Sequence, residues 1–266
     1  MATAYLWSDL TSPELARLAA QDTLAVVLLG CTEQHARHLP VDTDSFQAET
    51  LAALGCERAA AQHGVDTVRL PLMPFGPASE HYGFPGSISL SNELYVRFIK
   101  ELVASVIDNG FRRVGVMRSC GGHWVVPGAV WDAKADAERA GRKVVLHLLR
   151  SDEDWSKVRT DYFAGLEGAH AAAMETALCL ARRPQLVDTD QLVAPRLENF
   201  KARYLDGGEA FLFAEISDTG ALGTPVGATA EAGQRAWQAL AGAFAARIKL
   251  IEDLDREVLG AAGESR

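Results

Sequence analysis

Carboxylate and imidazole side chains gather in one short stretch of the chain, GCTEQHARHLPVDTD, which spans residues 30–44. Glu33 and His35 lie two residues apart, so they point to the same side of an extended chain. Asp44 follows nine residues after His35 and can fold back onto the pair across a loop. Such a set of oxygen and nitrogen ligands suits a divalent metal ion of the zinc, manganese or iron kind. The alternative is a polar loop in which Glu33 and Asp44 cap helices and His35 is solvated.

Two more segments carry side chains of the same types. Ser79, Glu80 and His81 form part of GPASEH, and His170 and Glu175 form part of GAHAAAMETA. Five residues correspond to about one and a half helical turns, so His170 and Glu175 face one site only if His170 stands at a loop or helix end. In isolation, both segments are more typical of structural roles than of catalytic ones, as a turn with a capping serine and as a helix amino terminus.

Apolar runs that could form strands alternate with amphipathic stretches that could form helices. Strand-like runs lie at 24–30, 67–73, 113–117 and 143–149, helix-like runs at 45–62, 92–108, 127–140, 169–181 and 229–254, and a loop-rich segment at 184–228. This alternation predicts an α/β fold with a mostly parallel sheet that helices cover on both faces. We find no linker or repeat, so we expect a single domain over residues 1–266.

The predicted strands place the polar segments at a common edge. Segments 30–44, 74–85 and 118–124 follow the first, second and third predicted strands. Because ligands bind beyond the carboxyl ends of the strands in open α/β sheets, these segments are expected to converge on one crevice.

The composition limits the partners and the location. The 35 acidic and 26 basic side chains give a net charge of −9, which argues against a nucleic-acid-binding protein. The apolar run Leu24–Leu29 is too short to span a membrane, and no targeting segment is visible. The four cysteines are scattered without a CxxC pair, which favours a reducing compartment, so we expect a cytoplasmic protein. Cys31 and Cys179 are expected to be small packing residues.

Three strings in this order, TEQHARHLPVDTD, PFGPASEHYGFPGSISLS and HAAAMETALCLA, resemble the creatininase (creatinine amidohydrolase) family. The resemblance runs from about Leu28 to Asp188. It implies a three-layer α/β/α sandwich with a mostly parallel central sheet, assembled as a homohexamer. It also implies a hydrolase acting on carbon–nitrogen bonds other than ordinary peptide bonds, with one or two divalent metal ions (Zn, Mn or Fe) per subunit.

The resemblance also implies roles for single residues. Glu33 matches a ligand of one metal, His35 a ligand of the other, and Asp44 the carboxylate that bridges both. Sharing an anionic ligand is physically reasonable for two cations about 3.5–4 Å apart. Glu175 is a candidate for a further ligand.

The remaining matches concern substrate and proton transfer. Ser79 matches a substrate-contacting position, with Glu80 and His81 beside it. His170 matches the general acid/base that hands a proton to the leaving nitrogen.

One segment departs from the family pattern NGHGGN or NGHxEN. This chain has RSCGGHW at 118–124, so Cys120 replaces the expected histidine, His123 replaces the asparagine, and Gly122 supplies no carboxylate. Cys120 could ligate the metal and favour softer ions, it could be a buried filler while His123 reaches in, or one metal could be lost. A fourth alternative is a thiol nucleophile paired with His123. Trp124 could wall a pocket or pack on the next helix.

Two arginines also depart from the pattern. Arg37 stands where the family has proline, and Arg118 where it has asparagine. If both line the crevice, they indicate an anionic small-molecule substrate. If they face solvent or pair with Asp42 and Glu80, they say nothing about the substrate.

The sequence therefore predicts a metal-dependent amidohydrolase for the C–N amide bond of a small cyclic amide, formamide or terminal peptide substrate. A metal-bound hydroxide would attack the carbonyl, and His170 would protonate the leaving amine. Two alternatives remain open, a catalytically degraded binding or subunit protein of the same fold and a Cys120-dependent hydrolase or transferase.

Overall fold

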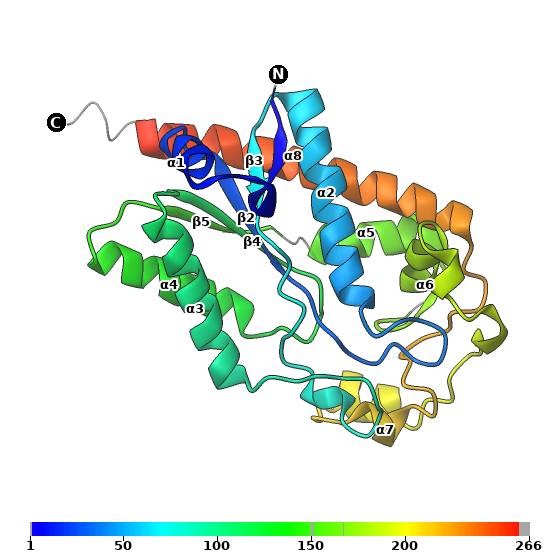
Figure 1. The fold of residues 1–266 in the computed structure, drawn as a ribbon. Helices are drawn as coiled ribbons and strands as arrows, with labels where there is room; N and C mark the ends of the chain where they lie inside the picture. Colours follow the sequence, from blue (N-terminus) through cyan, green and yellow to red (C-terminus); the bar gives the residue numbers. More distant parts are fainter. Residues whose placement is uncertain (1, 150–151, 167, 261–266) are drawn as a thin grey trace.

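The core of the molecule is a five-stranded parallel sheet (Figure 1). A computed structural model describes residues 2–149, 152–166 and 168–260. The strands are β1 (Ala4–Leu6), β2 (Leu24–Leu29), β3 (Thr67–Arg69), β4 (Arg113–Arg118) and β5 (Val145–Leu148), in the order β1-β3-β2-β4-β5. All four neighbouring pairs run parallel, as the alternation of strands and helices in the sequence predicts.

Helices cover both faces of the sheet and make three layers (Figure 1). The α-helices are α1 (Ser12–Ala20), α2 (Thr43–His63), α3 (Asn92–Asp108), α4 (Val126–Arg139), α5 (Asp152–Phe163), α6 (Ala173–Leu180), α7 (Phe213–Ile216) and α8 (Ala230–Gly260). Helices α2, α5, α6 and α8 pack in one core, and α1, α3 and α4 pack in the other. The predicted three-layer α/β/α architecture is confirmed.

The position of β2 between two helical layers explains why its sequence, LAVVLL, is apolar at every residue. Leu24, Val26 and Leu28 belong to the core that contains α2 and α8. The intervening Ala25, Val27 and Leu29 belong to the core that contains α3 and α4. Because successive side chains point to opposite faces of a sheet, a strand between two helical layers must be apolar at every position.

Helix α8 anchors the sheet through charged groups as well as apolar ones. Arg113 of β4 donates hydrogen bonds to Glu252 and Asp255 of α8, and Asp255 also lies 2.9 Å from Nε2 of His147 on β5. None of the described helices, α8 included, is long and apolar enough to cross a bilayer.

Most predicted elements match the structure, with a few differences. The strand predicted at 67–73 is shorter in the structure, where β3 ends at Arg69. Beyond it, Leu70 and Met73 still donate backbone hydrogen bonds to β2, and Met73 makes an isolated bridge to Leu29. Elements β1, α1 and α5 have no predicted counterpart, and the loop-rich segment 184–228 contains short helical turns and α7. The predicted helix 169–181 begins only at Ala173, which leaves His170 in the preceding loop.

The order of the strands creates a crevice beside β2. The chain passes from β2 to β3 on one side and then to β4 on the other, so the loops after β2 and β4 separate at their carboxyl ends. Leu29 pairs with Arg118 at the last register position of these strands. This is the topological switch point at which open α/β sheets bind ligands.

Candidate metal centre

Glu33, His35 and Asp44 come together at this switch point. One ligand atom from each lies within 4.8 Å of the others, and all three side chains are buried. Glu33 and His35 belong to the extended segment after β2, and Asp44 lies in the first turn of α2. The two-residue spacing and the returning loop thus produce the cluster that the sequence predicts.

The imidazole of His35 is oriented as in a metal site. Its Nδ1–H donates to the backbone oxygen of Glu33 at 3.1 Å, because a carbonyl can only accept. Its buried Nε2 makes no hydrogen bond within the described residues and lies 3.9 Å from Oε2 of Glu175. Metal-bound histidines are commonly held by their second nitrogen in this way, so the residues present fit a divalent cation.

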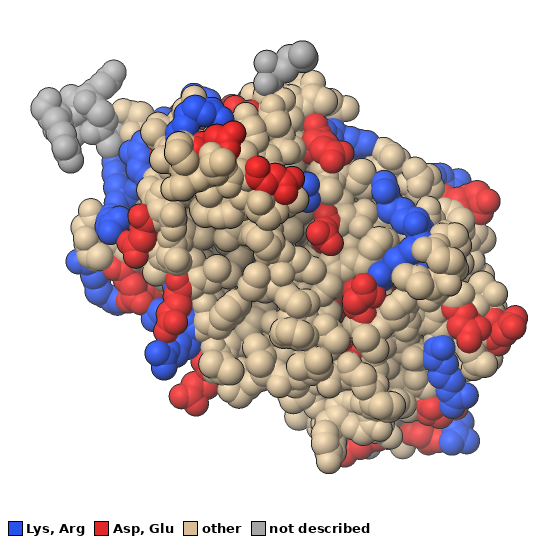
Figure 2. Space-filling model, viewed as in Figure 1, with Lys and Arg blue, Asp and Glu red and all other residues tan. Residues whose placement is uncertain are grey.

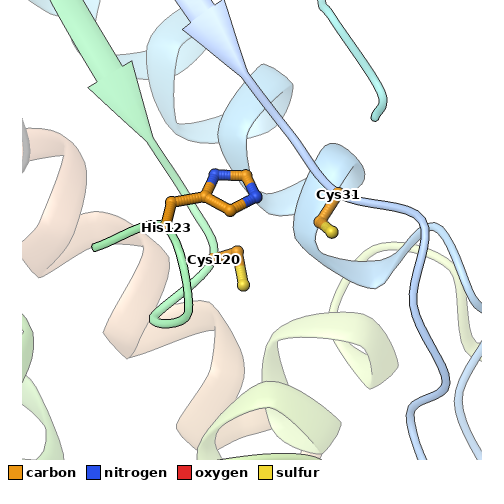
Figure 3. Close-up of side chains that lie close together, drawn as sticks. All are labelled: Cys31, Cys120 and His123. Atoms are coloured by element: carbon orange, nitrogen blue, oxygen red, sulfur yellow. The ribbon is translucent and has the colours of Figure 1, made fainter. Parts of the chain in front are cut away.

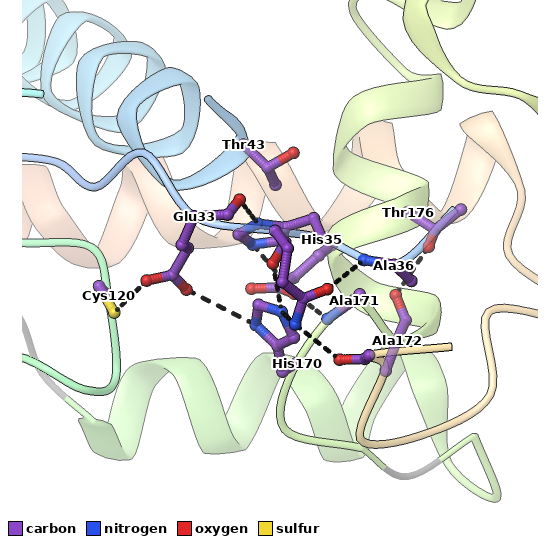
Figure 4. Close-up of polar contacts among 12 residues, drawn as sticks. Glu33, His35, Ala36, Thr43, Cys120, His170, Ala171, Ala172 and Thr176 are labelled. Carbon is purple, nitrogen blue, oxygen red and sulfur yellow. Dashed lines mark hydrogen bonds and ion pairs between the residues drawn. The ribbon is translucent and has the colours of Figure 1, made fainter. Parts of the chain in front are cut away.

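The carboxylate of Glu33 lies between Cys120 and His170 (Figure 4). Its Oε1 lies 3.3 Å from Nε2 of His81 and 3.7 Å from Nδ1 of His170, and its Oε2 accepts from the Cys120 thiol at 3.2 Å. Burial alone would raise the pKa of Glu33, but the His81 hydrogen bond and the nearby imidazoles hold it well below its usual range. Glu33 is therefore ionised, as a carboxyl group that binds a cation must be.

Gln34 organises the two histidines beside Glu33. Its side-chain amide donates to Nδ1 of His81 and to the Gly220 oxygen, both at 2.9 Å, which leaves the His81 proton on Nε2. Its backbone oxygen accepts from Nε2 of His170 at 2.7 Å, so Nδ1 of His170 faces Glu33. No local sequence pattern marks Gln34 as a site residue, because its partners lie up to 186 residues away.

Glu175 holds the backbone next to His170. Ala171 adopts a left-handed conformation, with φ at 49°, and its N–H donates to Oε2 of Glu175 at 2.6 Å. A non-glycine residue in this region is strained, and such strain collects at functional sites. Because His170 precedes α6, both side chains reach the same site, and together with His35 they form another group of possible ligands.

A cavity of about 630 Å³ opens above these groups. The predicted residues that line it are Glu33, Ser79, Glu80, His81, Cys120, Trp124 and His170. Trp124 is 74% exposed and stands at the wall of the cavity rather than against the following helix. Residues 209–213 and Glu215 form another part of the wall, and they belong to the loop-rich segment 184–228, for which the sequence predicts no site residue.

Glu80 fills the space that Gly122 leaves open. A Cβ built on Gly122 would lie 2.1 Å from Oε1 of Glu80. Position 122 supplies no carboxylate, but Glu80, from the loop after β3, places its carboxylate in the same space. Burial raises the pKa of Glu80 above its usual value.

The other predicted residues lie outside the cavity. Arg37 donates to the backbone oxygen of Asp218 at 3.3 Å, and Arg118 donates to the Cys120 oxygen and pairs with Asp152. His123 is buried beside Tyr95, whose hydroxyl lies 3.4 Å from its Nδ1. Both arginines thus have protein partners and do not line the crevice.

Comparison with known proteins agrees with this geometry. The family model described as "Creatininase: Creatinine amidohydrolase" matches residues 8–248. The chain belongs to the creatininase family. The match extends well past the resemblance at 28–188 in both directions, so it includes α1 and most of α8.

Named relatives in the creatininase family differ in substrate. The chain is 31% identical to the mycofactocin precursor peptide peptidase of Mycolicibacterium smegmatis over 230 residues, covering 85% of this chain and 84% of that one. It is 27% identical to the creatinine amidohydrolase of Pseudomonas putida over 194 residues, covering 67% and 71%. Creatininase-family members are hydrolases that act on carbon–nitrogen bonds, and this chain is one of them.

Solved creatininase structures share the fold. A putative creatinine amidohydrolase from Bacteroides fragilis superposes with a TM-score of 0.77 at 22% identity, covering 94% of this chain and 97% of that one. Other creatininase structures are described as a zinc form and a manganese form.

Proposed function

We propose that this chain is a metal-dependent amidohydrolase that cleaves a C–N amide bond of a small cyclic amide, formamide or terminal peptide substrate. The observation that carries this proposal is Nε2 of His35, which is buried, makes no hydrogen bond within the described residues, and lies beside the carboxylates of Glu33 and Asp44. A divalent cation held by these residues would polarise the substrate carbonyl and provide a nucleophile at neutral pH.

His170 is suited to move the proton. It lines the cavity, and its Nε2 proton is engaged by the Gln34 oxygen, so Nδ1 is the nitrogen that faces the reacting atoms. Burial and the neighbouring His35 hold the pKa of His170 well below its usual value, so the ring is neutral at pH 7. A neutral imidazole can take up a proton and pass it to the leaving nitrogen.

Further residues would support the same site. Cys120 lies next to Glu33 and adds a sulfur at the edge of the metal cluster. Glu175 acts as a positioning residue for the turn at His170, and its carboxylate lies near enough to His35 to serve as a ligand. Ser79 and Trp124 line the cavity where the substrate would bind.

The cavity favours a neutral or cationic substrate. Four of its described lining residues are glutamates and none is Lys or Arg: Glu33, Glu80, Glu209 and Glu215. The wall at Phe211, Leu212 and Phe213 is apolar. Because Arg37 and Arg118 have protein partners elsewhere, none of the described side chains that line the cavity supports the anionic substrate that their positions in the sequence predict.

The two alternatives have less support. A Cys120-dependent hydrolase needs a reactive thiolate, but the hydrogen bond with Cys31, burial and the neighbouring carboxylates raise the pKa of Cys120 well above its usual value. A degraded binding protein has no chemical need for the clustered Glu33, His35 and Asp44.

Location and assembly remain part of the proposal. Cys31 and Cys120 lie close together as free thiols, which suits a reducing cytoplasm. A homohexamer is proposed from the family resemblance.

Hydrolysis assays with matched variants test this function. Protein loaded with Zn²⁺, Mn²⁺ or Fe²⁺ is offered creatinine, an N-formyl amine and short peptides, and release of the amine is measured. We expect turnover of at least one class, loss on chelation and recovery with metal. Compared at equal metal content, His170→Asn should have a kcat lower by about 10²–10⁴-fold. Equal turnover by wild type and His170→Asn would contradict the assigned role.

A further inference from the structure

Cys31, Cys120 and His123 form a second cluster beside the first. Cys31 lies two residues after Leu29 of β2, and Cys120 lies two residues after Arg118 of β4. Because Leu29 and Arg118 are register partners in neighbouring parallel strands, the two cysteines continue the register into the crevice. Cys31 is buried, as expected of a packing residue, but its sulfur also lies near Cys120 and His123.

The three side chains meet at atoms that can bind a metal. One ligand atom from each lies within 4.8 Å of the others, and all three residues are buried. Figure 3 shows the ring of His123 turned toward Cys31, with the sulfur of Cys120 close to both. Two sulfurs and one imidazole nitrogen are a typical ligand set for zinc, and three protein ligands leave a fourth position open.

The surroundings hold these atoms in place. The N–H of Gly122 donates to Sγ of Cys120 at 3.2 Å and fixes the position of the sulfur. Gly76 makes room for the imidazole, because a Cβ there would lie 2.2 Å from Nε2 of His123. The Tyr95 hydroxyl, 3.4 Å from Nδ1, orients the ring from its other side, as outer contacts of metal ligands do.

The other two cysteines show what ordinary packing looks like in this chain. Cys56 lies in the apolar core under α2 and α8, and Cys179 lies in the small cluster with Leu39 and Val187. Neither belongs to a group of possible metal ligands among the described residues.

We propose that Cys31, Cys120 and His123 bind a soft divalent cation such as Zn²⁺ at a site of their own. The site adjoins the Glu33, His35 and Asp44 cluster, because the Cys120 thiol contacts Oε2 of Glu33 at 3.2 Å. The chain thus offers two chemically different sites side by side, one rich in sulfur and one rich in oxygen. This inference rests on the geometry of the three residues and does not require the proposed hydrolysis.

X-ray absorption at the metal edge of zinc-loaded full-length protein tests the site, since sulfur and oxygen ligands scatter differently. We expect sulfur scatterers at about 2.3 Å in the wild type. Cys31→Ser should lose about half of that signal, and the matched control Cys56→Ser should keep all of it. Absence of sulfur scattering in the loaded wild type, or a signal that Cys31→Ser leaves unchanged, overturns the proposal.

A second variant separates this site from the proposed catalytic one. His35→Gln should abolish amide hydrolysis and keep the sulfur signal, because His35 belongs only to the oxygen-rich site. Loss of the sulfur signal in His35→Gln would show a single shared site and overturn the inference, whatever the hydrolysis assay reports.

Discussion

His35 holds its imidazole through Nδ1 and presents Nε2 to the carboxylates of Glu33 and Asp44. A buried nitrogen without a hydrogen bond costs free energy in the apoprotein, roughly 1–3 kcal/mol. A bound cation would repay that cost. Metal binding would therefore be favoured by Nε2 of His35, which has no hydrogen bond in the folded apoprotein.

His38, three residues after His35, makes the free energy of unfolding depend on pH. Burial, with a contribution from His35, lowers the pKa of His38 to about 4, and its Nε2–H donates to Oγ1 of Thr176 at 2.9 Å. Between pH 6.5 and 4, the unfolded chain binds a proton at His38 that the folded chain does not. We expect the free energy of unfolding of the metal-free protein to fall as the pH drops through this range, measured by urea titration at each pH.

His38→Gln should flatten that decline, because glutamine does not titrate. His63→Gln, at the last residue of α2, serves as the control and should keep the wild-type slope. A slope that is the same in all three proteins would contradict the role of His38.

Local spacing made some residues predictable and left others out of reach. Glu33, His35 and Asp44 lie within one loop, so an extended pair and a returning turn suffice to cluster them. Gln34 lies between Glu33 and His35 in the sequence. Its hydrogen bonds to the Gly220 oxygen and from Nε2 of His170 nevertheless depend on tertiary packing. Cys31 was interpreted as packing because its partners Cys120 and His123 follow another strand.

At the scale of elements, the close contact of α6 with α8 supports the site. Gly233 of α8 lies against α6, and a Cβ there would lie 1.9 Å from the backbone oxygen of Ala177. Gly233→Ala should therefore push the helices apart and lower the free energy of unfolding by about 1–3 kcal/mol, measured by urea denaturation.

Gly242→Ala on the same helix is the matched control. Its Cβ would meet only Nη1 of Arg58, at the far end of a flexible side chain. Helix propensity should then leave stability unchanged or raise it by up to about 1 kcal/mol. Equal losses from both substitutions would mean that helix spacing is not the cause.

Strong periodicity made the central elements predictable, and short length hid the rest. The bounds Asn92–Asp108 of α3 match the prediction, and β2 and β4 differ from it by one residue. β1 has only three residues, which is too short for a pattern to be seen. Residues 209–213 carry no regular hydrophobic period, so their place in the cavity wall follows only from the folded chain.

For the whole molecule, one face is suited to assembly. Figure 2 shows few charged side chains in the centre of the face that carries loops 30–42 and 74–90, with charged groups around its margin. Val41, Phe75 and Ile88 are exposed on these loops, and a backbone hydrogen bond from the Ile88 N–H to the Thr32 oxygen joins the two loops. Exposed apolar patches of this kind mark protein interfaces.

If the proposed homohexamer uses this face, Ile88→Lys should dissociate it. Light scattering should give six times the chain mass for the wild type and less for Ile88→Lys. Leu254→Lys, on α8 and exposed to a similar degree (49% against 50% for Ile88), should leave the mass unchanged. A wild-type protein that runs as a monomer at micromolar concentration would contradict the assembly.

We propose that Glu33, His35 and Asp44 hold a catalytic divalent cation, and anomalous diffraction at the zinc edge from a zinc-loaded crystal would locate that ion. We expect anomalous density about 2.0–2.2 Å from Nε2 of His35 and from a carboxylate oxygen of Asp44, with a carboxylate oxygen of Glu33 at the same distance from this ion or from a second ion that Asp44 bridges. A fully loaded crystal with no peak at these three residues would contradict it.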